Sequence, residues 1–558
     1  MRFRLSRRHL VFIGLAVVIL IIVASLLYRR NSLWRPEQSL LALLPDAPVG
    51  YVSLKELRGL VETFQRSEFG KQTAKMPLLA EIQRELWWLE ARYQKQLWEH
   101  EMGGKLDLKR VLGYFGEEAI LGIYHRNDAL SFLLVSVVGA KEKLEVATIT
   151  ATDAVNPKYS RSKERYRDIE LNTITGYPRE FSYAFVGTLG VLSTDKALVQ
   201  ELIDIYAGAR KGFVERLPDG REFLAQYDAN HNGFYIDAQA INRLLPTQPL
   251  LQSVAKGAER WALNNRYENG VIHSAHRLRV KSDWTAGRAQ PLDERLLSLL
   301  PENTAFLSHT SGLHVTPLWR WLVTQGIVRA SQNSINLTPY LKADTTVALL
   351  ASPGDAPVLV PQLLVICPIA DRVGLQRELT KLKDLQLQVN RKPLQFLPPQ
   401  EYQGVAFYPA QLNLGFLLTL KGGHSIVGDY WVVSLTVGGL KAVIDTFTSQ
   451  AGSLATHPVL RTPLQGGDTA ATAQLDEPHQ GHFFAQPNRL IPEVRRFLPM
   501  AGLMASGSGI KVNPAAITRI SSNLFPLEAL GTVTAGIDHD ERTKIEADVR
   551  IVLEGPTE

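Results

Sequence analysis

The chain has 558 residues, of which 45% are hydrophobic and 21% are charged, a composition that excludes a largely disordered protein. Its single cysteine, Cys367, excludes an intramolecular disulfide framework and any metal site built from several cysteines. The formal net charge is +6, but residues 1–36 hold seven arginines and no acidic residue, so 54 basic and 55 acidic residues remain elsewhere. The bulk of the chain therefore has no charge bias toward nucleic acid, and we predict no nucleic-acid partner.

An uncharged run of 19 residues, Leu10–Tyr28, is the first element of the chain. At about 1.5 Å per residue, a helix of this length crosses a hydrocarbon core of roughly 30 Å. A cleaved signal peptide and a buried core helix are the alternatives, but the apolar run is long for a signal peptide and no small-residue cleavage site follows it. We predict a cytoplasmic tail at 1–9, a transmembrane signal anchor at 10–28 and a juxtamembrane linker at 29–40.

This anchor sets the predicted location and one predicted partner. The tail of nine residues before the anchor is short and can remain in the cytoplasm. The long region after the anchor can cross the membrane, because long domains translocate largely regardless of their charge. We therefore expect a single-pass protein of the inner (plasma) membrane with a cytoplasmic N-terminus. The bulk of the chain is then extracytoplasmic (periplasmic), and the lipid bilayer is a partner through Leu10–Tyr28.

The region beyond the anchor contains an internal repeat. Residues 40–46 (LLALLPD) return as residues 296–302 (LLSLLPE) at an offset of 256, and each copy leads into a strand-like run. Further matches follow in the same order: residues 119–121 with 348–350, 165–171 with 401–407, 192–193 with 433–434, 203–204 with 444–445, and 233–235 with 482–484. Several weak matches in one order favour duplication over chance.

Strand-like and helical patterns alternate within each copy. In the first copy, residues 119–124 and 130–138 predict neighbouring strands, and residues 181–193 predict two more strands broken at Gly187. Thr194 or Asp195 is placed to cap a helix over 196–207. Such pairs of adjacent strands followed by helices are typical of an α+β fold with a mostly antiparallel sheet. We predict an N-terminal transmembrane helix followed by two related lobes of this class, lobe 1 at 41–283 and lobe 2 at 284–558.

The repeat offset drops from 256 to 229 between its first two matches, so lobe 1 carries an insertion that lobe 2 lacks. A Trp-rich helix near 76–102 is predicted there, because apolar residues recur every three or four positions around Trp87, Trp88 and Trp98. This helix either covers its own sheet, presents a surface to a protein partner or lies on a membrane surface, the membrane being the weaker option because the helix has mixed charge.

Three short motifs give the chain a resemblance to a known family. They are the Leu-Pro openings at 44–48 and 300–304, each followed by a strand, and Tyr402-Gln403-Gly404-Val405 in the middle of the second lobe. With the N-terminal anchor, this pattern resembles an uncharacterised bacterial membrane-anchored family known only as a domain of unknown function. Lobe 1 departs from the pattern, with Asp168 where the glycine falls. The resemblance implies an architecture and brings no catalytic residue with it.

Two motifs raise the question of a metal site. Residues 228–233 (DANHNG) have the spacing that opens many calcium loops, but position twelve is Gln239 rather than glutamate, and Asn-Gly before a strand is also a turn signal. His479 and His482, preceded by Asp476 and Glu477, could ligate zinc, yet no supporting helix motif exists and a solvated loop is favoured. Calcium at Asp228–Gly233 stays an open alternative, and we predict no metal.

Other candidate residues have ordinary structural explanations. Ser193 and Lys196 have the spacing of a serine nucleophile with a lysine base, but the companion motifs are absent and helix capping explains them. Basic and aromatic residues alternate over 158–167, which favours a solvated hairpin. Cys367 lies in an apolar run, so burial is expected.

The sequence thus predicts neither catalytic nor cofactor-binding residues and no cofactor. The favoured function is a membrane-anchored extracytoplasmic binding or scaffold protein of the bacterial envelope, not an enzyme, with a protein partner. The alternatives are an envelope enzyme with a dispersed active site, and a binder of a small ligand or metal between the two lobes.

Overall fold

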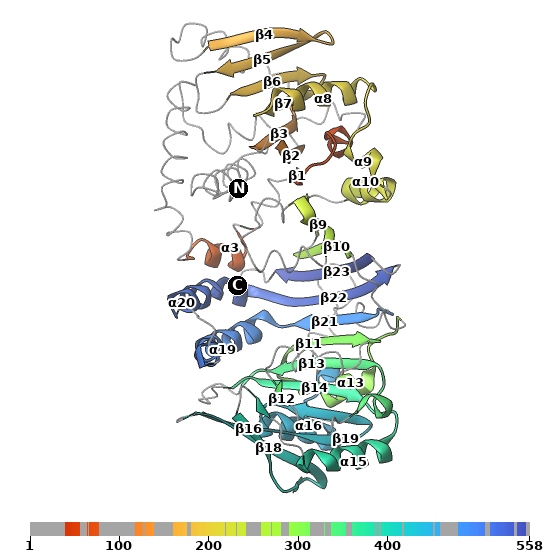
Figure 1. Cartoon of the computed structure of the whole chain (residues 1–558), viewed down its shortest axis with the longest axis vertical. Coiled ribbons are helices and arrows are strands. Elements are labelled where there is room, and N and C mark those ends of the chain that lie inside the picture. Colours follow the sequence, from red (N-terminus) through yellow and green to blue (C-terminus); the bar gives the residue numbers. More distant parts are fainter. Residues whose placement is uncertain are drawn as a thin grey trace. The chain divides into compact units, whose positions relative to one another are not determined.

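The structure is a computed structural model of the whole chain (Figure 1). It describes residues 39–55, 64, 66–76, 118–126, 129–138, 160–175, 180–217, 219–229, 232–240, 258–268, 270–280, 289–312, 328–329, 336–352, 360–384, 388–389, 392–415, 418–449, 452–457, 478–507, 514–540 and 544–553. These residues form two compact units. Unit 1 draws on Met1–Arg66, Leu78–Tyr267 and Ser274–Lys281, and unit 2 on Ser67–Pro77, Glu268–His273 and Ser282–Glu558.

Unit 1 is an antiparallel sheet with short helices. Its elements are η1 (Leu40–Leu43), β1 (Gly50–Lys55), β2 (Glu118–Arg126), β3 (Ala129–Val137), β4 (Ser160–Tyr166), β5 (Ile169–Thr175), β6 (Phe181–Val186), β7 (Leu189–Ser193), α8 (Lys196–Tyr206), α9 (Phe213–Arg216), α10 (Gly220–Ala229), β8 (Asn232–Asp237), β9 (Ala258–Glu268) and β10 (Val271–Val280), the last two extending into residues 268–273. Neighbouring strands follow the order β4-β5-β6-β7-β3-β2-β1-β8-β9-β10.

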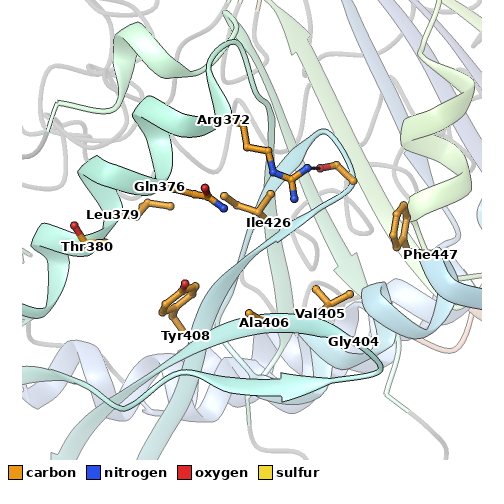
Figure 2. Close-up of a pocket in the computed structure, with 11 residues that line it drawn as sticks. Arg372, Gln376, Leu379, Thr380, Gly404, Val405, Ala406, Tyr408, Ile426 and Phe447 are labelled. Atoms are coloured by element: carbon orange, nitrogen blue, oxygen red, sulfur yellow. Dashed lines mark hydrogen bonds between the residues drawn. The ribbon is translucent and has the colours of Figure 1, made fainter.

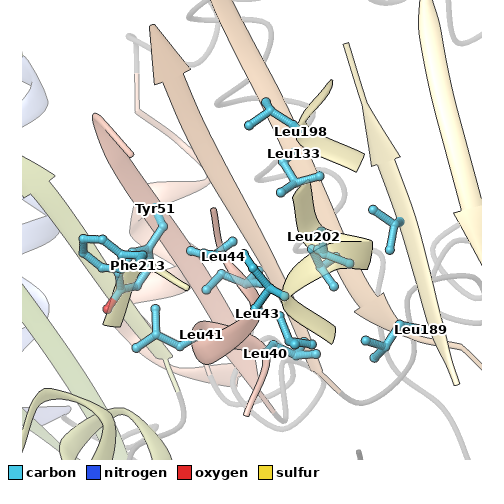
Figure 3. Close-up of a cluster of buried hydrophobic side chains, with 14 of the residues drawn as sticks. Leu40, Leu41, Leu43, Leu44, Tyr51, Leu133, Leu189, Leu198, Leu202 and Phe213 are labelled. Carbon is cyan, nitrogen blue, oxygen red and sulfur yellow. The ribbon is translucent and has the colours of Figure 1, made fainter. Parts of the chain in front are cut away.

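The core of unit 1 lies on one face of this sheet (Figure 3). The leucines of η1 are fully buried, and Leu198 and Leu202 of α8 pack into the same cluster. Tyr51 stacks on Tyr235 with ring centroids 5.6 Å apart, and Phe213 and Phe223 meet the pair edge-on. Apolar residues at alternate positions of the strands therefore pack with apolar residues at helical spacing on α8 to form one continuous core.

Unit 2 contains more elements, on a sheet of the same kind. They are α3 (Glu68–Thr73), α13 (Glu294–Leu299), β11 (Thr304–Ser311), β12 (Val328–Arg329), η3 (Thr338–Tyr340), β13 (Asp344–Leu350), β14 (Gln362–Pro368), α15 (Arg372–Thr380), η4 (Lys381–Asp384), β15 (Gln388–Val389), β16 (Lys392–Phe396), β17 (Gln400–Tyr402), β18 (Val405–Gly415), β19 (Leu418–Val427), β20 (Tyr430–Ser434), α16 (Val437–Ser449), η5 (Leu454–Thr456), β21 (Gly481–Ala485), α19 (Pro487–Gly507), α20 (Pro514–Asn523), η6 (Phe525–Ala529), β22 (Leu530–Asp540) and β23 (Lys544–Leu553).

The strands of unit 2 follow the order β17-β18-β19-β20-β14-β13-β11-β21-β22-β23, and β16 also pairs with β18. One face carries the main core, where α13 and α16 pack on residues such as Leu307, Leu364 and Phe484. The other face carries a smaller cluster in which Leu375 and Leu379 of α15 pack with Cys367 and Trp431. The sheet of unit 2 is thus covered on both faces where α15 lies.

The predicted fold class and location need correction. Among the described elements, strand residues outnumber helix residues, and every strand pairing whose register is described is antiparallel. No helix in the described part of the chain is long and apolar enough to cross a membrane. The longest, α19, has 21 residues but includes Arg489, Glu493 and two prolines, and such charges are costly in hydrocarbon. The segment Leu10–Tyr28 lies outside the described residues. The transmembrane helix in the predicted α+β fold and the single-pass inner-membrane location are therefore not supported.

One detail of the predicted repeat is also wrong. In unit 1, Gly122 pairs with Tyr51 and Leu133, and in unit 2, Ala348 pairs with Leu307 and Leu364. Ala348 thus occupies the position of Gly122, three residues from the predicted match with Ala119. Small apolar residues recur along this strand, so the alignment of the two copies by sequence was displaced by three residues from the alignment by strand pairing. The lobe boundaries at 41–283 and 284–558 stay predictions, and the Trp-rich helix near 76–102 lies outside the described residues apart from Met76.

Candidate functional site

A pocket of about 600 Å³ opens in unit 2 on the face of the sheet that carries α15 (Figure 2). Helix α15 forms one wall, the turns and adjoining residues of β18 and β19 form another, and the end of α16 closes it. The lining residues are Arg372, Gln376, Leu379, Thr380, Gly404, Val405, Ala406, Tyr408, Ile426, Gly428 and Phe447. A volume of this size is in the usual range for small-molecule sites.

Helix α15 is fixed by its N-cap and by its buried face. The Asp371 carboxylate accepts a hydrogen bond of 3.0 Å from the backbone N–H of Gly374, which satisfies a donor at the start of the helix. Leu375 and Leu379 are buried against the sheet. Because Arg372 and Gln376 are four residues apart, they lie on one helix face and line the pocket together.

The strand wall is built from an aromatic pair. Tyr408 of β18 lies opposite His424 of β19, and the two rings stack at 5.0 Å with an interplanar angle of 12°. Burial lowers the pKa of His424 to about 4, so this imidazole is neutral near pH 7. Tyr408 itself is 41% exposed and lines the pocket. The pocket therefore has a neutral, aromatic wall opposite α15.

Two tight turns shape the other end of the pocket. Gln403 and Gly404, between β17 and β18, have φ values of 49° and 76°, which allow the sharp reversal of this hairpin. Gly428 joins β19 to β20, and a Cβ atom there would come within 3.0 Å of the Phe447 ring. Phe447 is 42% exposed at the pocket edge. Glycine at 428 thus leaves room for the aromatic ring.

Arg372 is the one charged side chain among the eleven lining residues. Its Nη1 donates to the carbonyl oxygen of Gly428 over 3.4 Å, a long hydrogen bond that is drawn in Figure 2. In the part of unit 2 that the structure describes, no carboxylate lies within ion-pair distance of this guanidinium. Arg372 therefore keeps donors for an anion, while the apolar walls can cover an uncharged body.

The candidate calcium loop is not assembled as a loop in the described residues. Asp228 lies in α10, Asn230 and His231 are outside the described residues, and Asn232 and Gly233 already belong to β8. A Cβ atom on Gly233 would come within 2.5 Å of Asn264 Oδ1, so close packing between strands explains this glycine. Whether calcium binds here stays open.

The expectation of a solvated loop at His479 and His482 is wrong. His482 is fully buried in β21, where its Nε2 donates to the carbonyl oxygen of Gln290 over 2.9 Å. His479 is 9% exposed, and its Nδ1 lies 2.7 Å from Asp538. His309 of β11 pairs with His482 across the sheet, so three imidazoles lie side by side. Within the described residues no group of side chains is arranged to hold a metal ion, and Asp476 and Glu477 lie outside them.

Helix capping is confirmed for the Ser193–Lys196 motif. The Ser193 hydroxyl donates to the carbonyl oxygen of Phe132 over 2.7 Å and accepts from the Asp195 N–H. The Asp195 carboxylate caps α8 by accepting from the Ala197 N–H, and Lys196 pairs with Glu164. The motif is therefore structural.

Two further sequence-based interpretations can be compared with the structure. The basic run falls on β4, an exposed strand whose Lys163 pairs with Glu170 of the neighbouring strand β5. Cys367 is buried, and burial raises its pKa to about 12, which keeps the thiol protonated. The sequence analysis missed the pocket itself. Asp371 followed by Leu375 and Leu379 is the signal that could have located its helix.

Comparison with family models and with curated proteins finds no match. Crystal structures of TP0453 resemble part of the chain. Crystal form III has a TM-score of 0.27 and 7% sequence identity, covering 45% of this chain and 83% of that chain. Crystal form IV has a TM-score of 0.27 and 9% identity, with the same coverage. At such TM-scores the likeness carries no argument about fold or function.

Proposed function

We propose that this protein is a binding protein that takes up a small ligand in the pocket of unit 2. The observation that carries the proposal is the pocket itself, about 600 Å³, with one guanidinium set among aromatic and aliphatic walls. The lining combines apolar side chains such as Leu379 and Ile426 with the polar side chains of Arg372, Gln376 and Thr380, and ligand sites commonly pair apolar surface with a few orienting polar groups.

The distribution of exposed apolar side chains supports this proposal. Single exposed apolar residues are common on protein surfaces, but apolar side chains gathered in one place can mark a binding site. Tyr408 and Phe447 line the pocket and are 41% and 42% exposed, and Val373, adjacent to Arg372, is 66% exposed. An occupant of the pocket removes the first two from water, which is a source of binding free energy.

The lining chemistry favours binding over catalysis. General acid–base chemistry needs a titratable group within reach of the reacting atoms and with a pKa near the working pH. Arginine does not release its proton in proteins, and the other ten lining residues are neutral. The scaffold role with a protein partner stays a prediction from the sequence.

Filling the pocket tests the proposal. Ala406 lines the pocket from β18, so Ala406→Trp is expected to occupy the space and abolish binding of N-phenyl-1-naphthylamine, a neutral fluorescent probe that avoids assumptions about ligand charge. Lys392→Trp is the matched control, because Lys392 is exposed on β16 and does not line the pocket. The proposal is contradicted if the parent protein does not bind the probe, or if Ala406→Trp binds it as well as the parent protein does.

A further inference from the structure

We infer that the ligand of this pocket is a monoanionic amphiphile, a carboxylate on an aliphatic or aromatic body, with Arg372 holding the carboxylate. The inference rests on the proposed function, because it names the class of molecule that the same pocket takes. It goes further in three respects: it states the charge of the ligand, it states that the carboxylate end of the ligand binds Arg372, and it assigns the ligand to unit 2.

The charge of the ligand follows from what surrounds the cation. Arg372 contributes one positive charge, and its described hydrogen bond to Gly428 is 3.4 Å long, so the guanidinium can turn toward a better acceptor. Guanidinium and carboxylate form parallel, charge-assisted hydrogen bonds. One arginine matches the single charge of a carboxylate, and no second cation lines the pocket to balance a phosphate dianion.

No described carboxylate of unit 2 lies within ion-pair distance of Arg372, and three carboxylates near the pocket have partners of their own. Asp371 caps α15 through the Gly374 N–H. Glu378 pairs with Lys381, and Asp445 accepts hydrogen bonds from the Tyr402 hydroxyl and the Gln403 side chain. An incoming carboxylate therefore meets Arg372 as an available partner.

The body of the ligand follows from the walls below the guanidinium. Figure 2 shows Ile426 beneath Arg372, with Tyr408 and Phe447 at opposite ends of the pocket. The Tyr408 ring is backed by the His424 ring, which burial keeps neutral. An aliphatic chain or an aromatic ring can lie along these apolar surfaces.

Unit 1 does not offer the same surface at the equivalent strands. Strands β5 and β6 occupy the sheet position of β18 and β19, and their registers place Asn172 and Tyr183 where unit 2 has Tyr408 and His424. Asn172 accepts hydrogen bonds from Arg161, and Glu170, at the position of Ala406, pairs with Lys163. Polar pairs therefore occupy the face of β5 and β6 in unit 1 at the positions where Ala406 and Tyr408 line the pocket in unit 2. The ligand is accordingly assigned to unit 2.

Competition against the neutral probe N-phenyl-1-naphthylamine tests the inference at pH 7. Decanoate and decanol are the competitors, because they differ mainly in the anionic head group. We expect decanoate to compete more strongly than decanol, and Arg372→Gln to weaken decanoate about tenfold, the effect of losing a charge-assisted pair, while decanol is unchanged. Arg377→Gln is the matched control, since Arg377 is exposed on the same helix and outside the pocket.

The outcomes separate this inference from the proposed function. If the probe binds and Ala406→Trp blocks it, but decanoate competes equally in the parent protein and in Arg372→Gln, the ligand class is wrong and the binding function stands. Stronger competition by phenyl phosphate than by phenylacetate also overturns the class. If no probe binds at all, the binding function fails first. Thermal unfolding and near-ultraviolet circular dichroism of each variant show that the comparison is made on folded protein.

Discussion

Unit 1 and unit 2 follow the same path with different side chains at equivalent positions. The order of the ten strands across the sheet of unit 1, β4-β5-β6-β7-β3-β2-β1-β8-β9-β10, matches the order across the sheet of unit 2, β17-β18-β19-β20-β14-β13-β11-β21-β22-β23. Backbone contacts recur as well: the Leu44 carbonyl accepts from the Phe213 N–H over 2.8 Å, and the Leu300 carbonyl accepts from the Leu454 N–H over 2.7 Å. The hydrogen-bonded frame is therefore shared, although few residues are identical.

One row of side chains across each sheet shows how far the two units differ. In unit 1, Ser53 of β1 lies opposite Gly233 of β8, and its hydroxyl donates to the Gly233 carbonyl over 3.3 Å. In unit 2, the equivalent positions are His309 of β11 and His482 of β21, both buried. The next strand has Gly536 opposite His482, and a Cβ atom there would come within 2.3 Å of the His479 ring. Small residues in one unit are replaced by buried imidazoles in the other.

This difference teaches that the strand frame does not specify the chemistry of its interior. A serine and a glycine fill little space and do not titrate, whereas two buried histidines change their proton affinity on folding. The two units should therefore respond alike to the loss of a shared core contact, and differently to acid. The following predictions test that statement, beginning with the largest expected effect.

The shared core gives the largest effect. Leu44 and Leu300 are both fully buried at equivalent positions, so Leu44→Ala and Leu300→Ala should each lower the free energy of unfolding by about 2–5 kcal/mol. Urea unfolding measures the loss, and hydrogen exchange of β1 or β11 amides shows which unit is weakened. Leu435→Ala is the control, because Leu435 is 42% exposed and should change little. A strong effect in one unit alone would break the proposed equivalence.

Acid should weaken unit 2 through His309. Burial lowers its pKa to about 4, with His482 acting in the same direction and Asp344 and Asp293 opposing it. Because the folded pKa lies below the unfolded value of about 6.5, the unfolded state binds more protons, and stability falls as the pH drops from about 6.5 toward 4. This one group should reduce the stability of unit 2 by about 2 kcal/mol between pH 7 and pH 5.

Replacement of the imidazole sharpens this test. His309→Gln keeps a polar side chain near Thr346, which lies 2.8 Å from His309 Nδ1, but removes the titration. Unfolding of unit 2, followed by amide exchange corrected for intrinsic rates, should become less dependent on pH in this variant. His125→Gln is the control at an exposed histidine of unit 1. An unchanged pH dependence in His309→Gln would show that burial of His309 does not set the acid response.

The smallest expected effect lies in the turns that open β5 and β18. Asp168 and Gly404 have φ values of 64° and 76°, which L-residues rarely adopt. Gly404→Ala should destabilise unit 2 by about 1 kcal/mol, although no atom would contact the new Cβ. Asp168→Gly should leave unit 1 unchanged or slightly more stable, since glycine accepts this backbone. Thermal unfolding distinguishes the two, and equal losses in both variants would contradict the explanation from backbone conformation.

Local sequence patterns predicted individual strands and one helix well. The run at 119–124 lies within β2, and the run at 130–138 matches β3 to within one residue. The break at Gly187 separates β6 from β7, and the helix predicted at 196–207 matches α8 to within one residue, with Asp195 as its cap. Alternation and capping depend on neighbouring residues, which is why the sequence could locate these elements.

The site was harder to predict because its parts are distant in the chain. Arg372, Ala406 and Phe447 come from three elements, and no local motif joins them. The same reason explains the wrong prediction for His479 and His482. Their polar neighbours in sequence indicated a solvated loop, whereas pairing with β11 and β22 buries them.

The sequence by itself determined the composition class, the alternating strands and the capped helix α8, because these depend on side chains close together along the chain. Only the tertiary structure decided which strands are neighbours, that His309 lies beside His482, and that Arg372 lines a pocket together with Tyr408 and Phe447. Strand order and pocket shape depend on contacts between distant residues. A side chain such as histidine or arginine takes its role from the burial and charge that those contacts create.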